Sequence, residues 1–363
     1  MLRMLLPVER VWYANHPDRT WSCVTPDAGV RDFHRSLPGY APTELIELPA
    51  LAEELGVGRV FAKYEADRFS LPAFKGLGAS WAIHRALAAS DGRPDVPIVS
   101  ATDGNHGRAV AHFARLAGHP AVIVIPRGVS EVAIAAIRDE AADVRVIDGD
   151  YDAAVRAAEK YAQANGGILV QDTAWAGYEQ VPSWIVEGYE TMFAEIDEQL
   201  AACGVSAPDL FVVPAGVGSV TQAAVAHFRA GGRHGRTAIL NVEPTSAPCV
   251  LASLVAGERT SVVTGDTIMA GLNCNSVSTI AWPILGRGLD AAVAITDDQD
   301  RLAMRDLAGL GIDAGSCGAA CLAGARVALT GVDAESRRRH LGIGPTAVVV
   351  LLVTERRLPG FVA

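Results

Sequence analysis

The segment Leu210-Phe211-Val212-Val213-Pro214-Ala215-Gly216-Val217-Gly218-Ser219 decides the fold. Its apolar first half predicts a strand, the glycines predict a tight loop, and the apolar residues from Val220 and Thr221 onward predict a helix. The first amides of a helix have no partner inside the helix, so a strand, a glycine loop and a helix in this order form a cradle for a phosphate group. The backbone amides expected to bind it belong to Gly216, Val217, Gly218, Ser219 and Val220.

A second segment, Ser70-Leu71-Pro72-Ala73-Phe74-Lys75-Gly76-Leu77-Gly78, places one lysine among apolar and small residues. Such neighbours indicate close approach to a flat, buried group, whereas a surface lysine usually has polar neighbours. A lysine amine can form an imine with an aldehyde cofactor and can later act as an acid or a base. Either motif alone is a weak signal, but Lys75 and the phosphate loop together indicate a pyridoxal phosphate pocket.

Strand-like and helix-like stretches alternate along almost the whole chain, which is typical of a parallel sheet covered by helices. The strands are expected at residues 59–64, 96–101, 121–125, 144–147, 168–171, 210–213, 238–242, 291–296 and 347–353. The helices are expected at residues 76–89, 106–117, 151–164, 183–202, 220–230 and 298–310.

The strands fall into two clusters, and neither a repeat nor a low-complexity linker separates them. This pattern predicts two domains that share a long interface. Residues 1–77 and 181–363 are expected to form the larger, cofactor-binding domain, and residues 78–180 a smaller inserted domain. The predicted class is α/β, each domain being a twisted, mostly parallel sheet covered by helices. A cofactor would lie at the carboxyl ends of the strands.

Composition excludes several classes of protein. The chain has 363 residues, 50% of them hydrophobic, and a formal net charge of −10, so it can bury a large core but offers no basic surface for nucleic acid. No apolar stretch approaches the roughly 18 residues that span a bilayer. The apolar start ends at Pro7 and the charged pair Glu9-Arg10, without the core of a signal peptide. We expect a cytoplasmic protein with no nucleic-acid or membrane partner.

The six cysteines are spread along the chain without a CxxC pair, and no histidines stand at zinc spacing, so no metal site is expected. Cys317 and Cys321 would share one helical face, most simply as packing residues. Cys249 and Cys274 flank the segment from Val263 to Gly271, but a disulfide between them is not expected.

A third motif, Ala101-Thr102-Asp103-Gly104-Asn105-His106-Gly107, follows a predicted strand and opens a predicted helix. The Asn105 amide can reach the ring hydroxyl of the cofactor, although an asparagine in a capping turn would look similar. The backbone amides expected to bind a substrate carboxylate belong to Thr102, Gly104 and His106.

Asp103 is electrostatically unfavourable beside a carboxylate site, so its presence indicates a substrate with an extra positive charge or a second acid or base. Asp172, at the end of the predicted strand 168–171, is a second candidate for the same role. The alternative for Asp172 is a cap for the turn that follows it, and the residues alone leave both possibilities open.

These motifs carry a resemblance to the fold-type II pyridoxal phosphate enzymes, the group of the tryptophan synthase β subunit and threonine deaminase. Within that group the chain most resembles the diaminopropionate ammonia-lyase family. The general features are Pro42-Thr43-Glu44-Leu45, the lysine segment, the asparagine loop and the glycine loop. The narrower match rests on Asp67 to Lys75, on Asp103, on Val170 to Tyr178 and on Asp266 to Leu272.

The resemblance implies a homodimer of two-domain subunits that eliminates ammonia from 2,3-diaminopropionate and gives pyruvate and two molecules of ammonia. Lys75 would hold the cofactor as an imine, and Phe74 would pack against its ring. Asp103 and Asp172 would bind the substrate's β-ammonium group and move its protons. Thr354, at the end of the last predicted strand, is the candidate for the hydrogen bond to the pyridine nitrogen, which favours elimination over transamination.

The chain departs from the family in two places. Ser316-Cys317 replaces the usual acid-then-serine pair before Gly318, and the tail after Thr354 lacks the usual glycine- and aspartate-rich continuation. Two alternatives therefore stay open. One is a serine or threonine dehydratase or a β-replacement enzyme with the same cofactor, against which Asp103 and Asp172 argue. The other is a cofactor-binding protein without turnover, which the intact Lys75 disfavours.

Overall fold

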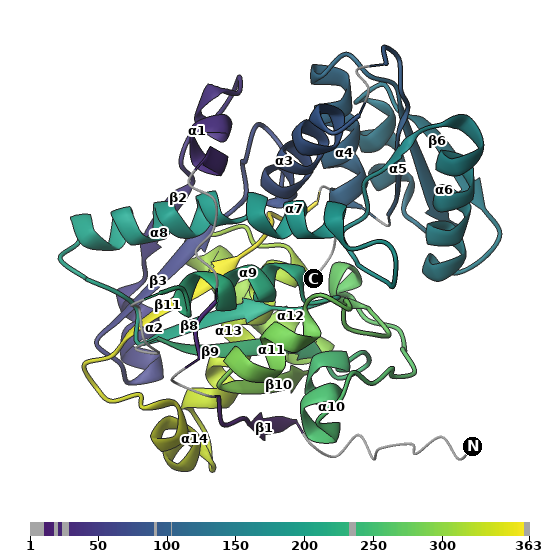
Figure 1. Ribbon diagram of the computed structural model, residues 1–363. Helices are drawn as coiled ribbons and strands as arrows, with labels where there is room; N and C mark the ends of the chain where they lie inside the picture. Colours follow the sequence, from purple (N-terminus) through teal and green to yellow (C-terminus); the bar gives the residue numbers. More distant parts are fainter. Residues whose placement is uncertain are drawn as a thin grey trace. The chain divides into compact units, whose positions relative to one another are not determined.

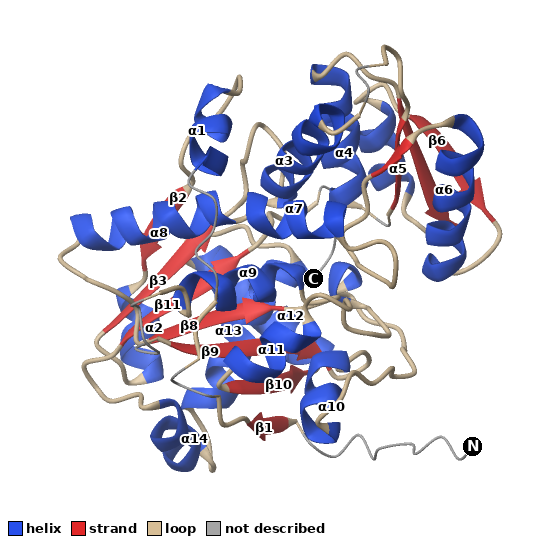
Figure 2. Cartoon of the chain, in the orientation of Figure 1, coloured by secondary structure: helices blue, strands red, loops and turns tan. Residues whose placement is uncertain are grey.

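The computed structural model describes residues 11–17, 21–23, 29–90, 93–102, 104–231 and 237–358. By packing, the chain divides into two units (Figure 1). The first unit comprises Met1–Pro26, Thr43–Ala66 and Phe193–Ala363, and the second comprises Asp27–Pro42 and Asp67–Met192. The second unit thus extends on both sides of residues 78–180, and the domain boundaries inferred from the sequence stay a prediction. In each unit a sheet, red in Figure 2, is accompanied by helices, blue in the same figure.

The first unit is built on a seven-stranded sheet in the order β1-β10-β9-β8-β11-β3-β2. The inner strands run parallel, and the edge strands β1 and β2 pair antiparallel to their neighbours. The strands are β1 (Trp12–Ala14), β2 (Glu44–Glu47), β3 (Arg59–Tyr64), β8 (Leu210–Pro214), β9 (Ala238–Pro244), β10 (Ala291–Ile295) and β11 (Val348–Val353). The helices are α2 (Pro49–Leu55), α9 (Ser219–Phe228), α10 (Cys249–Ala256), η1 (Ala270–Leu272), α11 (Trp282–Gly288), α12 (Asp297–Gly309), α13 (Ser316–Leu329) and α14 (Ala334–Leu341).

Strands β8 and β10 of this sheet are apolar along their whole length because both of their faces are covered. Every residue of β8 and β10 is buried. Helix α13 packs on β8, β9, β10 and β11. Its approach is close at Gly324, where a Cβ atom would lie 2.4 Å from Val242 Cγ2. A side chain at that position would therefore force the helix away from the sheet.

The second unit is built on a four-stranded parallel sheet in the order β6-β5-β4-β7. Its strands are β4 (Ile98–Ala101), β5 (Ala121–Pro126), β6 (Asp143–Ile147) and β7 (Ile168–Leu169). Its helices are α1 (Gly29–Ser36), α3 (Lys75–Ala88), α4 (Asn105–Leu116), α5 (Glu131–Arg138), α6 (Tyr151–Asn165) and α7 (Gln180–Gly188). Helix α6 begins where the Asp150 carboxylate caps the amide of Ala153, and it ends at Gly166 in the left-handed region.

Most of the predicted strands and helices differ from the structure by one or two residues at an end, and two of them differ for a reason that the contacts show. The strand predicted at 168–171 ends at Leu169, because Gln171 pairs through its side chain: its Oε1 accepts hydrogen bonds from the amide of Ala101 at 2.9 Å and from the Ser100 hydroxyl at 3.2 Å. The helix predicted at 183–202 is two helices, α7 and α8 (Glu190–Ala202). They break after Gly188, a poor helix former, and the amide of Tyr189 closes a tighter turn on the carbonyl of Val186 at 3.2 Å.

No single helix in the described part of the chain is long and apolar enough to cross a membrane. The pair α13 and α14 reaches that length and composition only together, across a bend of 106°.

Candidate active site

Lys75 and Asp172 form an ion pair in the second unit. Lys75 is the first residue of α3, and its Nζ lies 2.7 Å from Asp172 Oδ2. The Lys75 side chain is 25% exposed and the Asp172 side chain 11%, so the pair is mostly removed from water while the amine stays accessible. Burial would raise the pKa of Asp172, but the charge of Lys75 and the hydrogen bond from Lys75 hold it below its usual range. The carboxylate is therefore charged at neutral pH.

Asp172 owes its position to the loop that follows β7. The amide of Gln171 donates to the Tyr178 hydroxyl at 2.9 Å, and that hydroxyl donates to the carbonyl of Leu169 at 2.8 Å. The ring of Trp175 stacks on the ring of Tyr178 with their centroids 4.4 Å apart. Tyr178 thus closes the loop around Asp172, and Trp175 packs against it.

The asparagine loop lies between β4 and α4, where Asn105 is the first helical residue and Gly104 the residue before it. The amide of Gly104 donates to Thr102 Oγ1 at 3.0 Å, which tightens the turn. Thr102 is buried, whereas Gly104 and Asn105 are partly exposed. A Cβ atom at Gly107 would lie 2.1 Å from Thr102 Cγ2, so only glycine fits beneath this loop. Asp103 lies outside the described residues.

His106 connects the asparagine loop to the ion pair. Its Nε2 lies 3.0 Å from the carbonyl of Val170, and its Nδ1 lies 3.9 Å from Asp172 Oδ2. Burial lowers the pKa of His106, so the ring is neutral, and Nε2–H donates to Val170. Nδ1 then carries a lone pair that has no hydrogen-bond partner among the described residues. The structure therefore brings Lys75, Asp172 and His106 together, as predicted for residues of one site, and adds an imidazole side chain where only a backbone amide was expected.

Phe74 lies directly under the lysine. Its ring is buried, and Lys75 Nζ lies 5.2 Å from the ring centroid. The ring also contacts that of Tyr189, with centroids 4.8 Å apart. In the described structure Phe74 packs against protein side chains beside the amine, and its contact with a cofactor stays a prediction.

The glycine loop belongs to the first unit and is shaped by close packing. A Cβ atom at Gly216 would lie 2.7 Å from the carbonyl oxygen of Gly271 and 3.0 Å from Cys274 Sγ. Gly218 has a φ of +91° and stands directly before α9, which begins at Ser219. This is the strand, glycine loop and helix predicted from the sequence, and it leaves the first amides of α9 to be satisfied from outside the helix.

Thr354 follows β11 and has a buried side-chain hydroxyl. The residue is 3% exposed, and its Oγ1 has no hydrogen-bond partner among the described residues. A buried hydroxyl of this kind calls for an acceptor or donor that the described residues do not supply.

Glu355, the next residue, was not singled out from the sequence. Its Oε1 accepts a hydrogen bond from the amide of Cys317 at 3.2 Å, at the start of α13. A Cβ atom at Gly315 would lie 2.7 Å from the same oxygen. The sequence lacks an acid at position 316, and Glu355 supplies a carboxylate to the amino end of the same helix.

Cys249 and Cys274 lie near the glycine loop, and both are free thiols. Cys249 Sγ lies 3.4 Å from the carbonyl of Gly216, and burial raises the pKa of Cys249 well above its ordinary value. That Cys249 and Cys274 do not form a disulfide stays a prediction.

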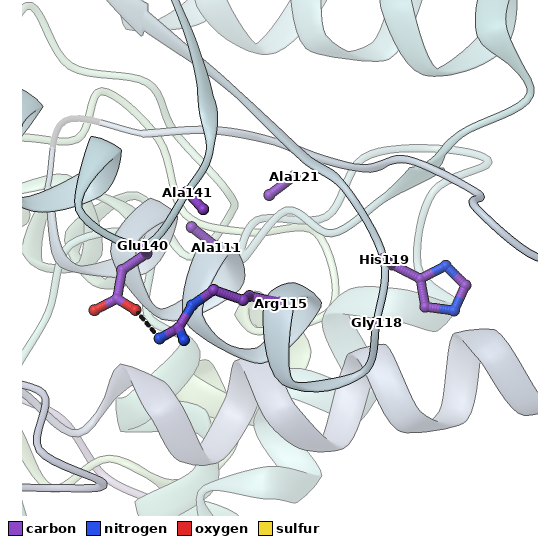
Figure 3. Close-up of a pocket in the computed structure, with 7 residues that line it drawn as sticks. All are labelled: Ala111, Arg115, Gly118, His119, Ala121, Glu140 and Ala141. Carbon is purple, nitrogen blue, oxygen red and sulfur yellow. Dashed lines mark hydrogen bonds and ion pairs between the residues drawn. The ribbon is translucent and has the colours of Figure 1, made fainter.

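A separate pocket of about 170 Å³ lies elsewhere in the second unit. Arg115 and Glu140 form an ion pair of 2.7 Å at its edge, and His119 stands on the other side (Figure 3). The pocket is formed by the last turn of α4 and the first residue of β5, whereas Asn105 is at the opposite end of α4. A helix of this length separates the two ends by roughly 16 Å, so the pocket is no part of the candidate active site.

Comparison with known proteins shows to which family the chain belongs. Residues 36–355 match the family described as pyridoxal-phosphate dependent enzyme. The chain is 34% identical over 348 residues to diaminopropionate ammonia-lyase of Escherichia coli strain K12, covering 90% of this chain and 87% of the relative. It is 39% identical over 287 residues to the Salmonella typhimurium enzyme of the same name, covering 73% and 71%. The chain belongs to the diaminopropionate ammonia-lyase family of pyridoxal-phosphate dependent enzymes.

The fold agrees with this family. The crystal structure of the Escherichia coli diaminopropionate ammonia-lyase in complex with an aminoacrylate-PLP azomethine intermediate superposes with a TM-score of 0.87 at 31% identity, covering 95% of this chain and 93% of that chain. Maize serine racemase shares the fold, with a TM-score of 0.76 at 21% identity and coverage of 96% and 95%. The predicted fold class, a fold-type II enzyme with mostly parallel sheets, is confirmed.

The residues of this chain fit pyridoxal phosphate. The first unit provides the amides at the start of α9, suited to a phosphate, and the orphaned hydroxyl of Thr354, suited to a ring nitrogen. The second unit provides a primary amine at Lys75 with a carboxylate at 2.7 Å. When bound, the cofactor draws electrons from the Cα atom of an amino acid and so labilises the bonds around it.

Proposed function

We propose that this enzyme converts 2,3-diaminopropionate and water to pyruvate and ammonia by α,β-elimination. The observation that supports this proposal most directly is the Lys75–Asp172 pair. It joins an amine that can bind the cofactor to a carboxylate that stays charged at neutral pH. A carboxylate is the group that favours a substrate with a second ammonium group over one with a hydroxyl.

The cofactor is assigned to residues of both units. Lys75 would carry it as an imine, Phe74 would pack against its ring, and Asn105 would bind its ring hydroxyl. The phosphate would be bound by Gly216, Val217, Gly218, Ser219 and Val220, of which the last lies in the first turn of α9. Thr354 would bond the pyridine nitrogen, which agrees with a hydroxyl that has no hydrogen-bond partner among the described residues.

The substrate is assigned to the asparagine loop and to Asp172. The amides of Thr102, Gly104 and His106 would bind its α-carboxylate. Asp103 and Asp172 would bind the β-ammonium group and keep it protonated, because ammonia is a far better leaving group than the amide anion. His106 is neutral and buried, with its Nδ1 3.9 Å from Asp172 Oδ2, so it adds no charge beside that carboxylate.

The proposed proton transfers need only these side chains. Lys75, once released from the cofactor, would take the proton from Cα on one face of the substrate, and a carboxylate would take it on the other. The two enantiomers of diaminopropionate would then depend on different groups.

A substrate panel tests the proposal. Purified enzyme is incubated with both enantiomers of 2,3-diaminopropionate, with serine and with threonine, and the keto acid and ammonia released are measured. We expect diaminopropionate to be turned over fastest, with two molecules of ammonia per pyruvate. A preference for serine or threonine would replace this proposal by a dehydratase, and no release from any substrate would favour a binding protein without turnover.

We further propose that the enzyme works in the cytoplasm as a homodimer, as the family resemblance implies. All six cysteines are free thiols, in agreement with a reducing compartment. Light scattering on the eluting protein should give twice the 38.0 kDa of one chain, and a value near a single chain would contradict the dimer.

A further inference from the structure

Tyr189 lies at the break between α7 and α8, next to the lysine of the candidate site. It is fully buried, and its ring packs 4.8 Å from the ring of Phe74 at an angle of 54°. On the other side its Cε1 lies 2.7 Å from the position that a Cβ atom of Gly78 would take. Phe74 and Gly78 flank the first turn of α3, so the tyrosine ring lies against the turn that begins with Lys75.

The Tyr189 hydroxyl makes no hydrogen bond to a described residue. It is buried and has no hydrogen-bond partner in the part of the chain that the structure describes. Buried hydroxyls are nearly always bonded, and an exception indicates a group that arrives or moves during function. Burial raises the pKa of Tyr189 to about 12, so the group remains a hydrogen-bond donor throughout the working pH range.

Lys75 Nζ lies 5.2 Å from the centroid of the Phe74 ring, which the Tyr189 ring also contacts. The charge of Lys75 lowers the pKa of Tyr189 and the charge of Asp172 raises it, so the two oppose each other. His106 faces the same pair from α4, and burial lowers its pKa, so it is neutral. Lys75 is the flexible member of the group, since four methylenes carry its amine.

The protonation state of Lys75 decides whether its amine can accept a hydrogen bond from the Tyr189 hydroxyl. An ammonium has three protons and no lone pair, so it cannot accept a hydrogen bond from a phenol. In that form Lys75 pairs with Asp172 at 2.7 Å. A neutral amine does have a lone pair, gains little from the carboxylate and is the form that attacks a carbonyl or removes a proton.

We propose that Tyr189 is a positioning residue for Lys75, and that its hydroxyl donates a hydrogen bond to the neutral amine when that amine leaves Asp172. This inference rests on the role proposed above for Lys75. It gives the amine two alternative partners, a carboxylate for the charged form and a phenol for the neutral one. Tyr189 thereby favours the neutral, reactive form and holds it close to the first turn of α3.

Amine acylation tests the proposal without cofactor or substrate. Cofactor-free protein is given brief pulses of N-hydroxysuccinimidyl acetate over a series of pH values, and acetylation of Lys75 is quantified by peptide mass spectrometry. Only the neutral amine reacts, so the pH midpoint reports the balance between the two forms. In Tyr189→Phe we expect the midpoint to move to higher pH by about half a unit to one unit, which is three- to tenfold slower labelling at neutral pH.

Two control variants make the result specific. Thr237→Val removes a buried hydroxyl of the first unit that donates to the carbonyl of Pro208 at 2.8 Å, so it should lower the thermal midpoint and leave the labelling midpoint unchanged. Asp172→Asn should move the labelling midpoint to lower pH, which shows that the assay responds to the partners of Lys75. Tyr189→Phe itself should not lower the thermal midpoint, since its hydroxyl bonds no described residue.

A second probe keeps the tyrosine ring and oxygen in place. Incorporation of 3,5-difluorotyrosine at position 189 makes the hydroxyl a stronger donor, so the labelling midpoint should move to lower pH. A midpoint in Tyr189→Phe that is unchanged or lower overturns the proposal, as does an unchanged midpoint with the fluorinated residue. Borohydride reduction of the loaded enzyme separately identifies the lysine bound to the cofactor, so failure of the Tyr189 proposal is distinguishable from failure of the function proposed for Lys75.

Discussion

The two units hold the candidate residues in different chemical forms. The second unit offers side chains that can carry protons, since Lys75 Nζ and His106 Nδ1 lie 2.7 Å and 3.9 Å from Asp172 Oδ2. The first unit offers mainly backbone, in a loop where Gly216 and Gly218 leave no room for a side chain. Changes in the second unit should therefore alter the reaction, whereas changes in the first should alter retention of the cofactor.

The largest effect is expected from Lys75→Ala. The yellow colour of the purified protein, an absorption near roughly 410 to 420 nm, should disappear because no imine can form. Turnover should fall by about a thousandfold or more, since both the attachment of the cofactor and a proton acceptor are lost. Absorption spectroscopy and peptide mapping after borohydride reduction check this, and a label on another lysine would contradict the assignment.

The next largest effects are expected from replacing the carboxylates of Asp172 and Asp103. Asp172→Asn and Asp103→Asn keep the shape of the side chain, so the absorption band should persist, while turnover should fall by about a hundred- to ten-thousandfold in at least one of them. The two enantiomers of diaminopropionate should respond unequally. Near wild-type rates in both variants would remove the argument for this substrate.

Gly218→Asp tests the other side of the comparison. The residue has a φ of +91°, and a Cβ atom there would lie 2.9 Å from Leu285 Cδ1, so the new side chain is strained and its charge opposes a phosphate. Cofactor affinity should fall by about a hundredfold or more, measured by equilibrium dialysis. Gly257→Asp is the matched control, with a φ of +73° and open space around it, and equal cofactor content in the two variants would exclude the loop as the phosphate site.

Thr354→Val should have a smaller effect on the same property. The side chain keeps its shape and loses only the hydroxyl that has no partner among the described residues. One hydrogen bond is worth about 1 kcal/mol, so cofactor affinity should fall roughly fivefold, with a shift of the absorption band. Unchanged affinity and spectrum would mean that the pyridine nitrogen has another partner.

Asp300 is an exception to the contrast, because it is a titratable side chain buried in the first unit. Both of its carboxylate oxygens lack a hydrogen-bond partner among the described residues. Burial raises the pKa of Asp300 to about 8, with further contributions from the charges of Asp297 and Glu355. The folded protein therefore holds a proton that the unfolded chain releases, and stability falls as pH rises from the ordinary value of 3.8 to about 8.

Asp300→Asn should remove this pH dependence. Between pH 6 and 8 the free energy of unfolding of the variant should fall less than that of the parent, by on the order of 2 kcal/mol, since each unit corresponds to about 1.4 kcal/mol. Urea denaturation at several pH values measures this difference. Parallel curves for the two proteins would show that the carboxyl group is ionised in the folded state.

Much of the fold follows from local pattern. Strand β3 was predicted with its observed bounds, Arg59–Tyr64, and the strands around the glycine loop within one or two residues, because buried parallel strands are continuous apolar runs bounded by polar residues or glycine. The antiparallel edge strands β1 and β2 were not predicted. They are short, and their pairing depends on strands distant in sequence, β10 and β3.

The residues of the candidate site also differ in whether their neighbours in sequence reveal them. Lys75, Asn105 and the glycine loop stand within dense motifs, so their neighbours in sequence reveal them. Tyr189 and Glu355 do not, because their significance comes from contacts with Phe74 and with Cys317 far along the chain. A signal for Tyr189 did exist in Gly188, whose small size interrupts a helical pattern beside an aromatic residue.

The packing of α3 on α7 has a consequence for enzyme engineering. A Cβ atom at Gly188 would lie 2.5 Å from the carbonyl oxygen of Leu77, and one at Gly78 would lie 2.9 Å from the carbonyl oxygen of Ile185. Two glycines, Gly78 on α3 and Gly188 on α7, thus set the spacing between these two helices. A single added methyl group at either position would overlap backbone of the neighbouring helix and push the two helices apart, so it would move the helix that begins with Lys75 although every functional side chain keeps its identity.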